Sequence, residues 1–274
     1  MQRPLILPLA TLLALSAAGC GKVQARAELK KGNSYYQQEQ YTKALNYFRK
    51  GLELDPDATF AWRSVGLSAL ALYRPGDDSR QNVEYASTAI DAFEKYLAEY
   101  PDDDKIAEYL MSTYVNAKKY KEAIAFIDQR IQEKPEERAN LQRARITILT
   151  QAGQLDKAFQ LVQQLQGEER AQALYSIGVS AWDKVFHDPG MMDYESKNRL
   201  VDMGLDATKK ALATKPDYVD AMIYYGLLLR EKAKLETDGA KRLAYQDEAV
   251  TWQQKAIEAR KKAAAQAAKA PANT

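Results

Sequence analysis

Two residue types are almost absent from this sequence. Among its 274 residues there is one cysteine, Cys20, and one histidine, His187. A single cysteine excludes an intrachain disulfide and a cysteine-rich metal site. One histidine leaves little for the commonest metal ligand and general base. The sequence also has no glycine-rich phosphate loop, no Ser/His/Asp order and no spaced His/Glu metal motif. We therefore expect no enzymatic activity, no cofactor and no metal.

An excess of charge of one sign is missing as well. The chain has 39 Lys and Arg against 37 Asp and Glu, a formal net charge of +2. Such a balance creates no global field that would attract nucleic acid, and we expect no nucleic-acid partner. Carboxylate runs such as "PDDDK" and "KPEER" follow prolines, where they cap the next helices. His187 precedes Asp188 and Pro189 at a predicted turn, which favours a surface or capping role.

The N-terminal residues have the layout of a secretory signal peptide. One positive charge at Arg3 is followed by an apolar stretch over residues 5–15 and by small residues up to Gly19. This run is too short to span a bilayer as a mature helix. The sequence therefore predicts a signal segment over residues 1–19.

The end of this segment, "AAGC", resembles the bacterial lipobox, although Ala17 stands where leucine is usual. The resemblance implies that Cys20 becomes the lipidated first residue, with residues 20–24 as a short tether. Lipidation would consume the unpaired sulfur in a thioether, and several acyl chains would anchor the protein stably. Gly21, rather than aspartate, favours the outer membrane by resemblance to lipoprotein sorting rules. A signal peptide that is not lipidated remains the alternative.

One spacing recurs along the rest of the chain. Gly32 and Gly66 lie 34 residues apart. A small residue precedes a proline by twelve positions four times, at Ala44–Pro56, Ala89–Pro101, Ala123–Pro135 and Gly204–Pro216. Small residues allow two antiparallel helices to approach closely, and proline ends the second helix. The spacing therefore predicts repeated helical hairpins.

The stretch "GNSYYQQEQYTKALNYFRKGLELDP" shows the small–large–small order of such a hairpin and resembles the tetratricopeptide repeat. The resemblance implies an all-α, right-handed α-solenoid of about six hairpins over residues 25–260, followed by an Ala/Lys-rich tail over 261–274. The six copies are marked by Gly32, Tyr35, Tyr41, Ala44, Phe48 and Gly51; by Trp62, Gly66, Ala89 and Phe93; by Leu110, Tyr114, Tyr120, Ala123 and Ile127; by Leu149, Gly153, Leu155, Ala158 and Val162; by Leu174, Ile177, Gly178, Gly204 and Ala211; and by Met222, Tyr225, Gly226, Ala249, Trp252 and Ala256.

Three copies are longer than the family's usual repeat. The second and sixth copies contain about eleven added residues, close to three helical turns, so both of their helices are expected to lengthen. The fifth copy contains an added irregular piece around "HDPG". These insertions are either tolerated loops or projecting hairpins that form a second docking surface, for example over residues 74–84.

In tetratricopeptide repeats the first helices line a concave groove, and the resemblance implies that a partner polypeptide binds there. The expected groove residues are Asn33, Tyr36, Gln37, Arg63, Lys105, Glu108, Ser112, Asn116, Asn140, Arg143, Thr147, Gln151, Tyr175 and Trp182. The family's carboxylate clamp for chaperone tails is only partly matched. Asn33 and Lys105 fit it, whereas Leu29, Ser64 and Tyr109 stand at its other positions.

The expected function is therefore that of a lipid-anchored scaffold for protein–protein interaction in the bacterial envelope. It would face the periplasm and take part in assembling an outer-membrane, pilus or secretion complex. The alternative is a lipoprotein that binds cell wall or polysaccharide, which would need exposed aromatic or basic residues along the groove.

Overall fold

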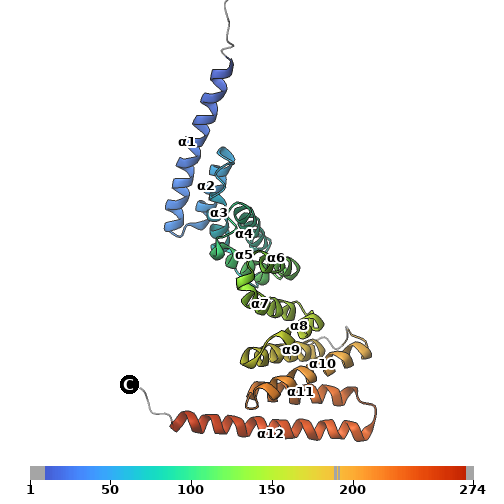
Figure 1. Ribbon diagram of the computed structural model, residues 1–274. Helices are drawn as coiled ribbons and strands as arrows, with labels where there is room; N and C mark the ends of the chain where they lie inside the picture. The colour runs from blue at the N-terminus through green and yellow to red at the C-terminus, as the bar shows by residue number, and fades with distance from the viewer. Residues whose placement is uncertain (1–9, 188–189, 191, 270–274) are drawn as a thin grey trace, which may run out of the picture. The chain divides into compact units, whose positions relative to one another are not determined.

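The computed structural model describes residues 10–187, 190 and 192–269, and the side chains of residues 21–266 within these ranges (Figure 1). Asp188, Pro189 and the side chain of Cys20 lie outside the described residues, as do those of the predicted signal segment. By contact the chain divides into two compact units, residues 1–123 (unit 1) and 124–274 (unit 2), with the boundary inside one helix. No described helix combines the length and apolar content that a bilayer crossing requires.

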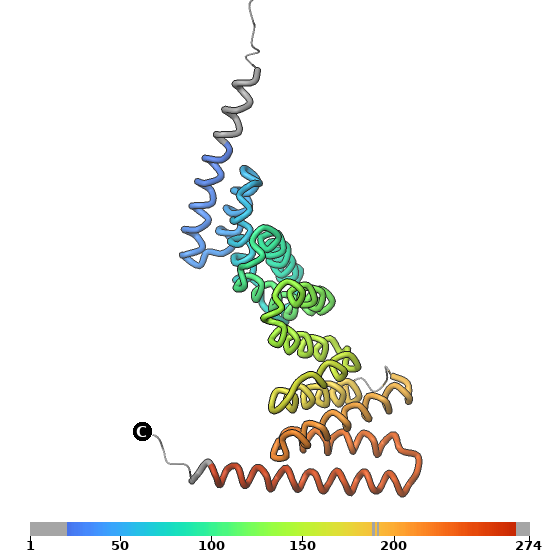
Figure 2. The backbone as a smooth tube through the Cα atoms, viewed as in Figure 1, coloured from blue at the N-terminus to red at the C-terminus, as the bar shows by residue number. Residues whose placement is uncertain are grey.

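The described residues form α-helices, two short 3₁₀ turns and no strand, as Figure 2 shows, which confirms the all-α fold class. The elements are α1 (Ala10–Gln37), α2 (Tyr41–Leu54), α3 (Ala61–Leu72), α4 (Arg80–Glu99), α5 (Asp104–Asn116), α6 (Tyr120–Glu133), η1 (Pro135–Glu137), α7 (Arg138–Gln151), α8 (Leu155–Leu161), η2 (Val162–Gln164), α9 (Gly167–His187), α10 (Tyr194–Thr214), α11 (Val219–Leu235) and α12 (Gly239–Lys269).

Three of the hairpins turn in the same way. Glu39, Lys118 and Gly153 each adopt a positive φ, between 57° and 68°. The next residue then donates its backbone N–H to a carbonyl five residues back, at distances of 2.8–2.9 Å: Gln40 to Tyr35, Lys119 to Tyr114 and Gln154 to Leu149. This is the Schellman closure of a helix C-terminus. The hairpins of the first, third and fourth repeats are therefore joined by one tight turn.

The closing prolines also act alike. The residues before Pro56, Pro101, Pro135 and Pro216 leave the helical region, with φ between −126° and −141°. A helical angle is disfavoured before proline because the ring clashes with the preceding backbone. Each second helix of these repeats thus ends two residues before its proline.

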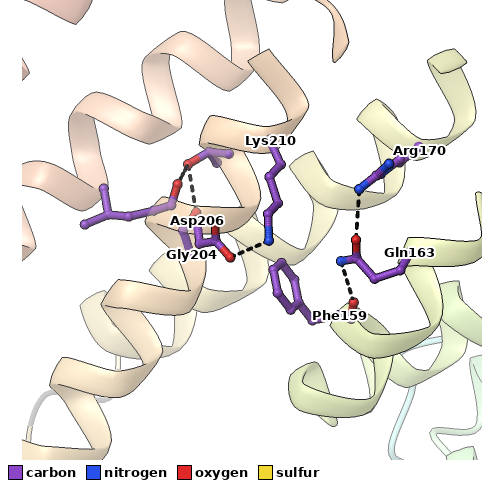
Figure 3. Close-up of polar contacts among 8 residues, drawn as sticks. Phe159, Gln163, Arg170, Gly204, Asp206 and Lys210 are labelled. Atoms are coloured by element: carbon purple, nitrogen blue, oxygen red, sulfur yellow. Dashed lines mark hydrogen bonds and ion pairs between the residues drawn. The ribbon is translucent and has the colours of Figure 1, made fainter. Parts of the chain in front are cut away.

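The fourth repeat lacks a closing proline and ends differently (Figure 3). The amide of Gln163 donates to the Phe159 carbonyl at 3.2 Å and accepts from Arg170 Nη2 at 2.8 Å. Arg170 belongs to α9, so one side chain closes α8 and ties it to the next repeat. Lys210 of α10 lies over the Phe159 ring at 4.7 Å, which adds a second link between the repeats.

The glycines of the first helices mark places with no room for a side chain. A Cβ at Gly32 would lie 2.6 Å from the Phe48 ring, and one at Gly66 would lie 2.4 Å from the Phe93 ring. Both rings are fully buried. The expected pairing of a glycine with a large ring on the second helix is therefore confirmed in these two repeats. In the fifth repeat Thr208, rather than a ring, faces Gly178.

The second repeat differs from the expectation that both helices lengthen. Its second helix, α4, has 20 residues, but α3 has only 12 and ends before Pro75. The added residues instead form a turn that is held by the buried side chain of Asn82. Asn82 accepts from the Arg74 N–H at 2.7 Å and donates to the carbonyls of Arg74 and Asp77 at 2.8 and 2.7 Å. In the sixth repeat both helices are long, with 17 and 31 residues.

The N-terminal side of the first repeat also differs from the expectation. Residues 21–24, predicted as a tether, already belong to α1. Lys22 pairs with Asp57 at 3.4 Å, and Ala25 is buried. The first repeat therefore has no extended segment after residue 20.

The packing at Gly66 predicts a strong effect of a larger residue. Gly66→Leu would drive its side chain into the buried Phe93 ring, and we expect a loss of about 3 kcal/mol in the free energy of unfolding. Denaturant unfolding followed by circular dichroism measures this loss. Gly239→Leu is the control, because a Cβ there meets only Arg242 at 3.9 Å. Equal effects of the two variants would contradict the packing described.

Loss of the Asn82 side chain should release the turn of the second repeat. Asn82→Ala leaves three backbone groups of that turn without their partner, and we expect a cost of about 2 kcal/mol with faster proteolysis between residues 73 and 79. Gln81→Ala is the matched control, since Gln81 is exposed and bonds only Tyr85 on its own helix. If the turn resists protease in both variants, Asn82 does not hold it.

Candidate partner-binding groove

The predicted groove residues fall in both units, and none of them is fully buried. In unit 1, α1, α3 and α5 carry Asn33, Tyr36, Gln37, Arg63, Lys105, Glu108, Ser112 and Asn116. In unit 2, α7 and α9 carry Asn140, Arg143, Thr147, Gln151, Tyr175 and Trp182. Most of these residues are exposed, whereas Tyr36, Arg143, Tyr175 and Trp182 are partly buried.

In unit 1 the structure brings together residues of three first helices. Burial raises the pKa of the Tyr36 phenol, Tyr41 and Tyr109 raise it further, and Arg63 lowers it. Arg63 itself lies 3.6 Å from Asp103, the residue that caps α5. The charge of Arg63 is thus already compensated by a neighbouring carboxylate.

Lys105 and its neighbours are also engaged within α5. The Lys105 ammonium lies over the Tyr109 ring at 5.3 Å and 4.0 Å from Glu108, and the Ser112 hydroxyl donates to the Tyr109 carbonyl. Among the described residues, no hydrogen bond or ion pair joins the exposed side chains of Asn33, Gln37 and Asn116 to this group. Unit 1 therefore presents separate polar side chains rather than one converging site.

Unit 2 contains a cavity of about 730 Å³ between α7 and α9. We call this cavity the α7–α9 groove. Four of the predicted residues line it: Arg143, Thr147 and Gln151 from α7, and Tyr175 from α9. The other lining residues are Ile146, Thr150, Leu165, Glu169, Gln172, Ala173, Ser176, Val179, Ser180 and Asp183. Trp182 and Asn140 do not line it.

A salt bridge joins α7 and α9 across the groove. Arg143 Nη1 of α7 lies 2.9 Å from both carboxylate oxygens of Glu169 on α9, and Arg143 Nη2 donates to the Asn140 side chain. Both charged side chains are about half exposed, so the bridge adds under about 1 kcal/mol to stability. Arg143 is therefore a paired residue of the groove and not a free cation.

The wall of the groove offers mainly apolar groups to a ligand, because three of its hydroxyl groups already form hydrogen bonds within their own helices. Thr147, Thr150 and Ser176 each donate to a carbonyl of their own helix, at 2.8–3.1 Å. The side chains of Ile146 and Val179 lie beside them. The polar groups left for a ligand are chiefly the amides of Gln151 and Gln172, together with the carboxylate of Asp183, which also lies beside His187.

Aromatic rings continue from the groove towards α11. Tyr175 lies 4.9 Å from Tyr218 and 5.7 Å from Tyr224, between ring centroids. Tyr224 in turn meets Trp182 at 5.5 Å, and Trp182 stacks on the half-exposed Phe186 at 4.7 Å. The indole N–H of Trp182 is buried without a hydrogen-bond partner among the described residues. Trp182 therefore belongs to this aromatic cluster and not to the groove wall.

The electrostatics of this region are acidic on balance. Burial raises the pKa of Tyr175 to about 12, with a further contribution from the Asp220 carboxylate. Asp183 lies 3.0 Å from His187, whose exposed ring confirms a surface position. Since Glu169 is paired with Arg143 and Asp183 lies beside His187, Asp220 is the carboxylate that acts on the Tyr175 phenol. The described residues contain no group of three or more side chains fit to hold a metal.

The sequence analysis did not find Glu169, Asp183 or Tyr224. Glu169 lies in the first turn of α9. A carboxylate at that place is expected simply because it stabilises the start of a helix. Asp183 lies eight residues, about two turns, after Tyr175. Extending the predicted groove face of α9 by two turns from Tyr175 would have included it. Tyr224 comes close only because α11 packs on α9.

Comparisons with known proteins address the repeat itself. Residues 25–58 match the family model for the tetratricopeptide repeat. No curated protein matches the sequence. Similar solved structures include YrrB, described as a TPR protein with an unusual peptide-binding site, with 20% identity over 71% of this chain and 88% of that one, and a TM-score of 0.42.

Two other structures are similar to a comparable degree. A TPR repeats protein from Bacteroides fragilis has 17% identity over 83% of this chain and 98% of its own, with a TM-score of 0.41. MamA has 16% identity over 88% and 93%, with a TM-score of 0.34. The chain thus contains a tetratricopeptide repeat at residues 25–58, in the first of its helical hairpins.

Proposed function

We propose that this protein is an interaction scaffold that holds an extended segment of a partner protein in the α7–α9 groove. The observation that carries the proposal is the cavity of about 730 Å³ between two successive first helices. Its volume is in the range of sites that bury a ligand. A tetratricopeptide repeat in the same chain supports a role in protein–protein interaction.

The lining suits a polypeptide. The apolar wall around Ile146 and Val179 can bury a side chain, while the amides of Gln151 and Gln172 can bond a peptide backbone. No nucleophile, paired acid and base or metal ligand converges there. The groove therefore offers binding surface rather than chemistry.

The charge of the groove favours a segment that carries lysine or arginine. Among the described residues, Asp183 of the lining lies beside His187 but forms no ion pair with a lysine or arginine, and Asp220 forms none beside the groove, whereas Arg143 is already paired with Glu169. The rings of Tyr175 and Tyr224 offer faces that attract a cation. A basic side chain beside an apolar one would use both features.

We further propose that Cys20 is lipidated and that the scaffold faces the periplasm from the outer membrane. The sequence pattern at residues 13–22 supports this proposal. Since residues 21–24 are helical, the first repeat would lie close to the lipid surface. A scaffold held there would suit the assembly of an outer-membrane, pilus or secretion complex.

A bulky cation in the groove should block the partner. Ser176→Arg places a long charged side chain on the exposed α9 face, and we expect partner capture to fall by about tenfold or more. Thr214→Arg on α10 is the matched control, because Thr214 is also exposed and its hydroxyl also donates to its own helix. Chemical cross-linking followed by affinity capture from cell envelopes measures the effect.

Two outcomes would contradict the groove as the site. Capture that survives Ser176→Arg but is lost when residues 74–84 are shortened would place the partner on the second repeat's turn. Retention of purified glycans, with no protein captured, would favour the alternative of a polysaccharide-binding lipoprotein.

The anchor has its own test. Cys20→Ser should abolish the incorporation of labelled fatty acid and release the protein from membranes after a high-salt wash, because the acyl chains are the main anchor. Labelling and fractionation measure both effects. A serine variant that still sediments with membranes would show that Cys20 is not the anchor.

A further inference from the structure

In unit 2 a first helix packs into the angle between the two helices of the preceding hairpin, a position that we call a seat. The seat of the fifth repeat, formed by α9 and α10, holds α11. Leu228 of α11 packs where a Cβ on Gly204 would lie, at 2.8 Å. Tyr224 of α11 meets the rings of Tyr175 and Trp182. A first helix therefore docks into the angle between the two helices of the hairpin before it.

The last hairpin forms the same seat. In the fifth repeat a Cβ on Gly178 would lie 3.4 Å from the Gly204 carbonyl oxygen, and in the sixth a Cβ on Gly226 would lie 3.4 Å from the Ala249 carbonyl oxygen. In both hairpins, therefore, a glycine of the first helix lies close to a backbone carbonyl of the second helix. When the two hairpins are aligned on Gly178 and Gly226, Ile223 and Arg230 of α11 correspond to Tyr175 and Trp182 of α9. Those two residues of α9 contact the next helix, α11.

No described residue outside α11 and α12 lines the seat of the last hairpin. It is a cavity of about 300 Å³ that we call the terminal seat, lined by Ile223, Gly226, Leu227, Arg230, Ala249, Gln253, Ala256, Ile257 and Arg260. Figure 1 shows α12 running past the end of the shorter α11. The terminal seat therefore resembles the site between α9 and α10 that holds α11.

The outer side of α12 is apolar where a terminal helix is usually polar. Leu243, Val250 and Ile257 are 60%, 54% and 40% exposed and follow one another at seven-residue intervals. That spacing keeps them on one side of the helix. An outer helix face that no neighbouring repeat covers is normally polar in solenoids, and no described residue covers these three. This apolar stripe points to a partner at the end of the stack.

The charge around the terminal seat indicates the chemistry of that partner. Arg230 donates to the neutral amide of Gln253 at 2.7 Å, and Arg260 lines the same cavity. From residue 255 to residue 269, α12 has five cationic residues and one carboxylate. A second copy that docked by the same end would bring like charges together.

We propose that the terminal seat binds an amphipathic helix with acidic flanks from a partner protein. Its apolar side would cover Ile223, Leu227 and Ile257, and its carboxylates would face Arg230 and Arg260. This surface is separate from the α7–α9 groove, so the protein can hold two partner segments at once.

The test uses the full chain with Cys20→Ser and a labelled synthetic helix of about five turns, with leucines at i, i+3, i+4 and i+7 and glutamates elsewhere. Fluorescence anisotropy should show saturable binding of this peptide and none of its twin with lysines in place of glutamates. The double variant Arg230→Glu/Arg260→Glu should weaken binding by about tenfold or more.

The matched control is Lys241→Glu/Arg242→Glu, which makes the same charge change on exposed residues at the other end of α12 and should leave binding intact. Equal losses from both double variants would overturn the proposal, as would absence of binding. A dimer of the chain that Ile257→Asp dissociates would show that a second copy occupies the seat. Ser176→Arg should leave this peptide bound, so the test is independent of the groove.

Discussion

The structure depends on the close approach of paired helices at small residues. At Gly66 a single added carbon would enter the ring of Phe93, and at Gly32 it would enter the ring of Phe48. Such contacts fix how each first helix is rotated against its second helix, because any other rotation places a larger side chain in the gap. Once the buried face is fixed, the opposite face of each first helix is fixed as well. In unit 2, Gly178 of α9 approaches Thr208 of α10 in the same way, which fixes the rotation of one of the two helices that line the α7–α9 groove.

Much of this architecture could be predicted from local chemistry. The interval from Ala44 to Pro56 predicted a second helix, and the residue before the proline leaves the helical region as expected. What depended on distant contacts could not be predicted. Asn82 reads as an ordinary polar residue, yet its buried side chain organises a turn that replaces the expected longer helix. Gln163 closes the fourth repeat only because Arg170 of the next helix reaches it.

The groove also combines features that could be predicted from local chemistry with features that depend on distant contacts. The exposure of Thr147 and Gln151 could be predicted, because helical spacing turns them away from the buried face of α7. The pairing of Arg143 with Glu169 was not foreseen, and it changes the chemistry, since the groove loses the cation that the sequence suggested. Part of the acidic and aromatic character near Tyr175 comes from Asp220 and Tyr224 of α11, which lies beside α9 only in the folded unit.

The most direct test of the account is to find which surface touches the partner in living cells. A photo-activated benzoylphenylalanine at Gln172 would lie in the α7–α9 groove, and one at Val83 would lie on the exposed side of α4. Cross-linked products are then identified by mass spectrometry. We expect a specific protein adduct from position 172 and none from position 83. An adduct from position 83 with none from position 172 would contradict it.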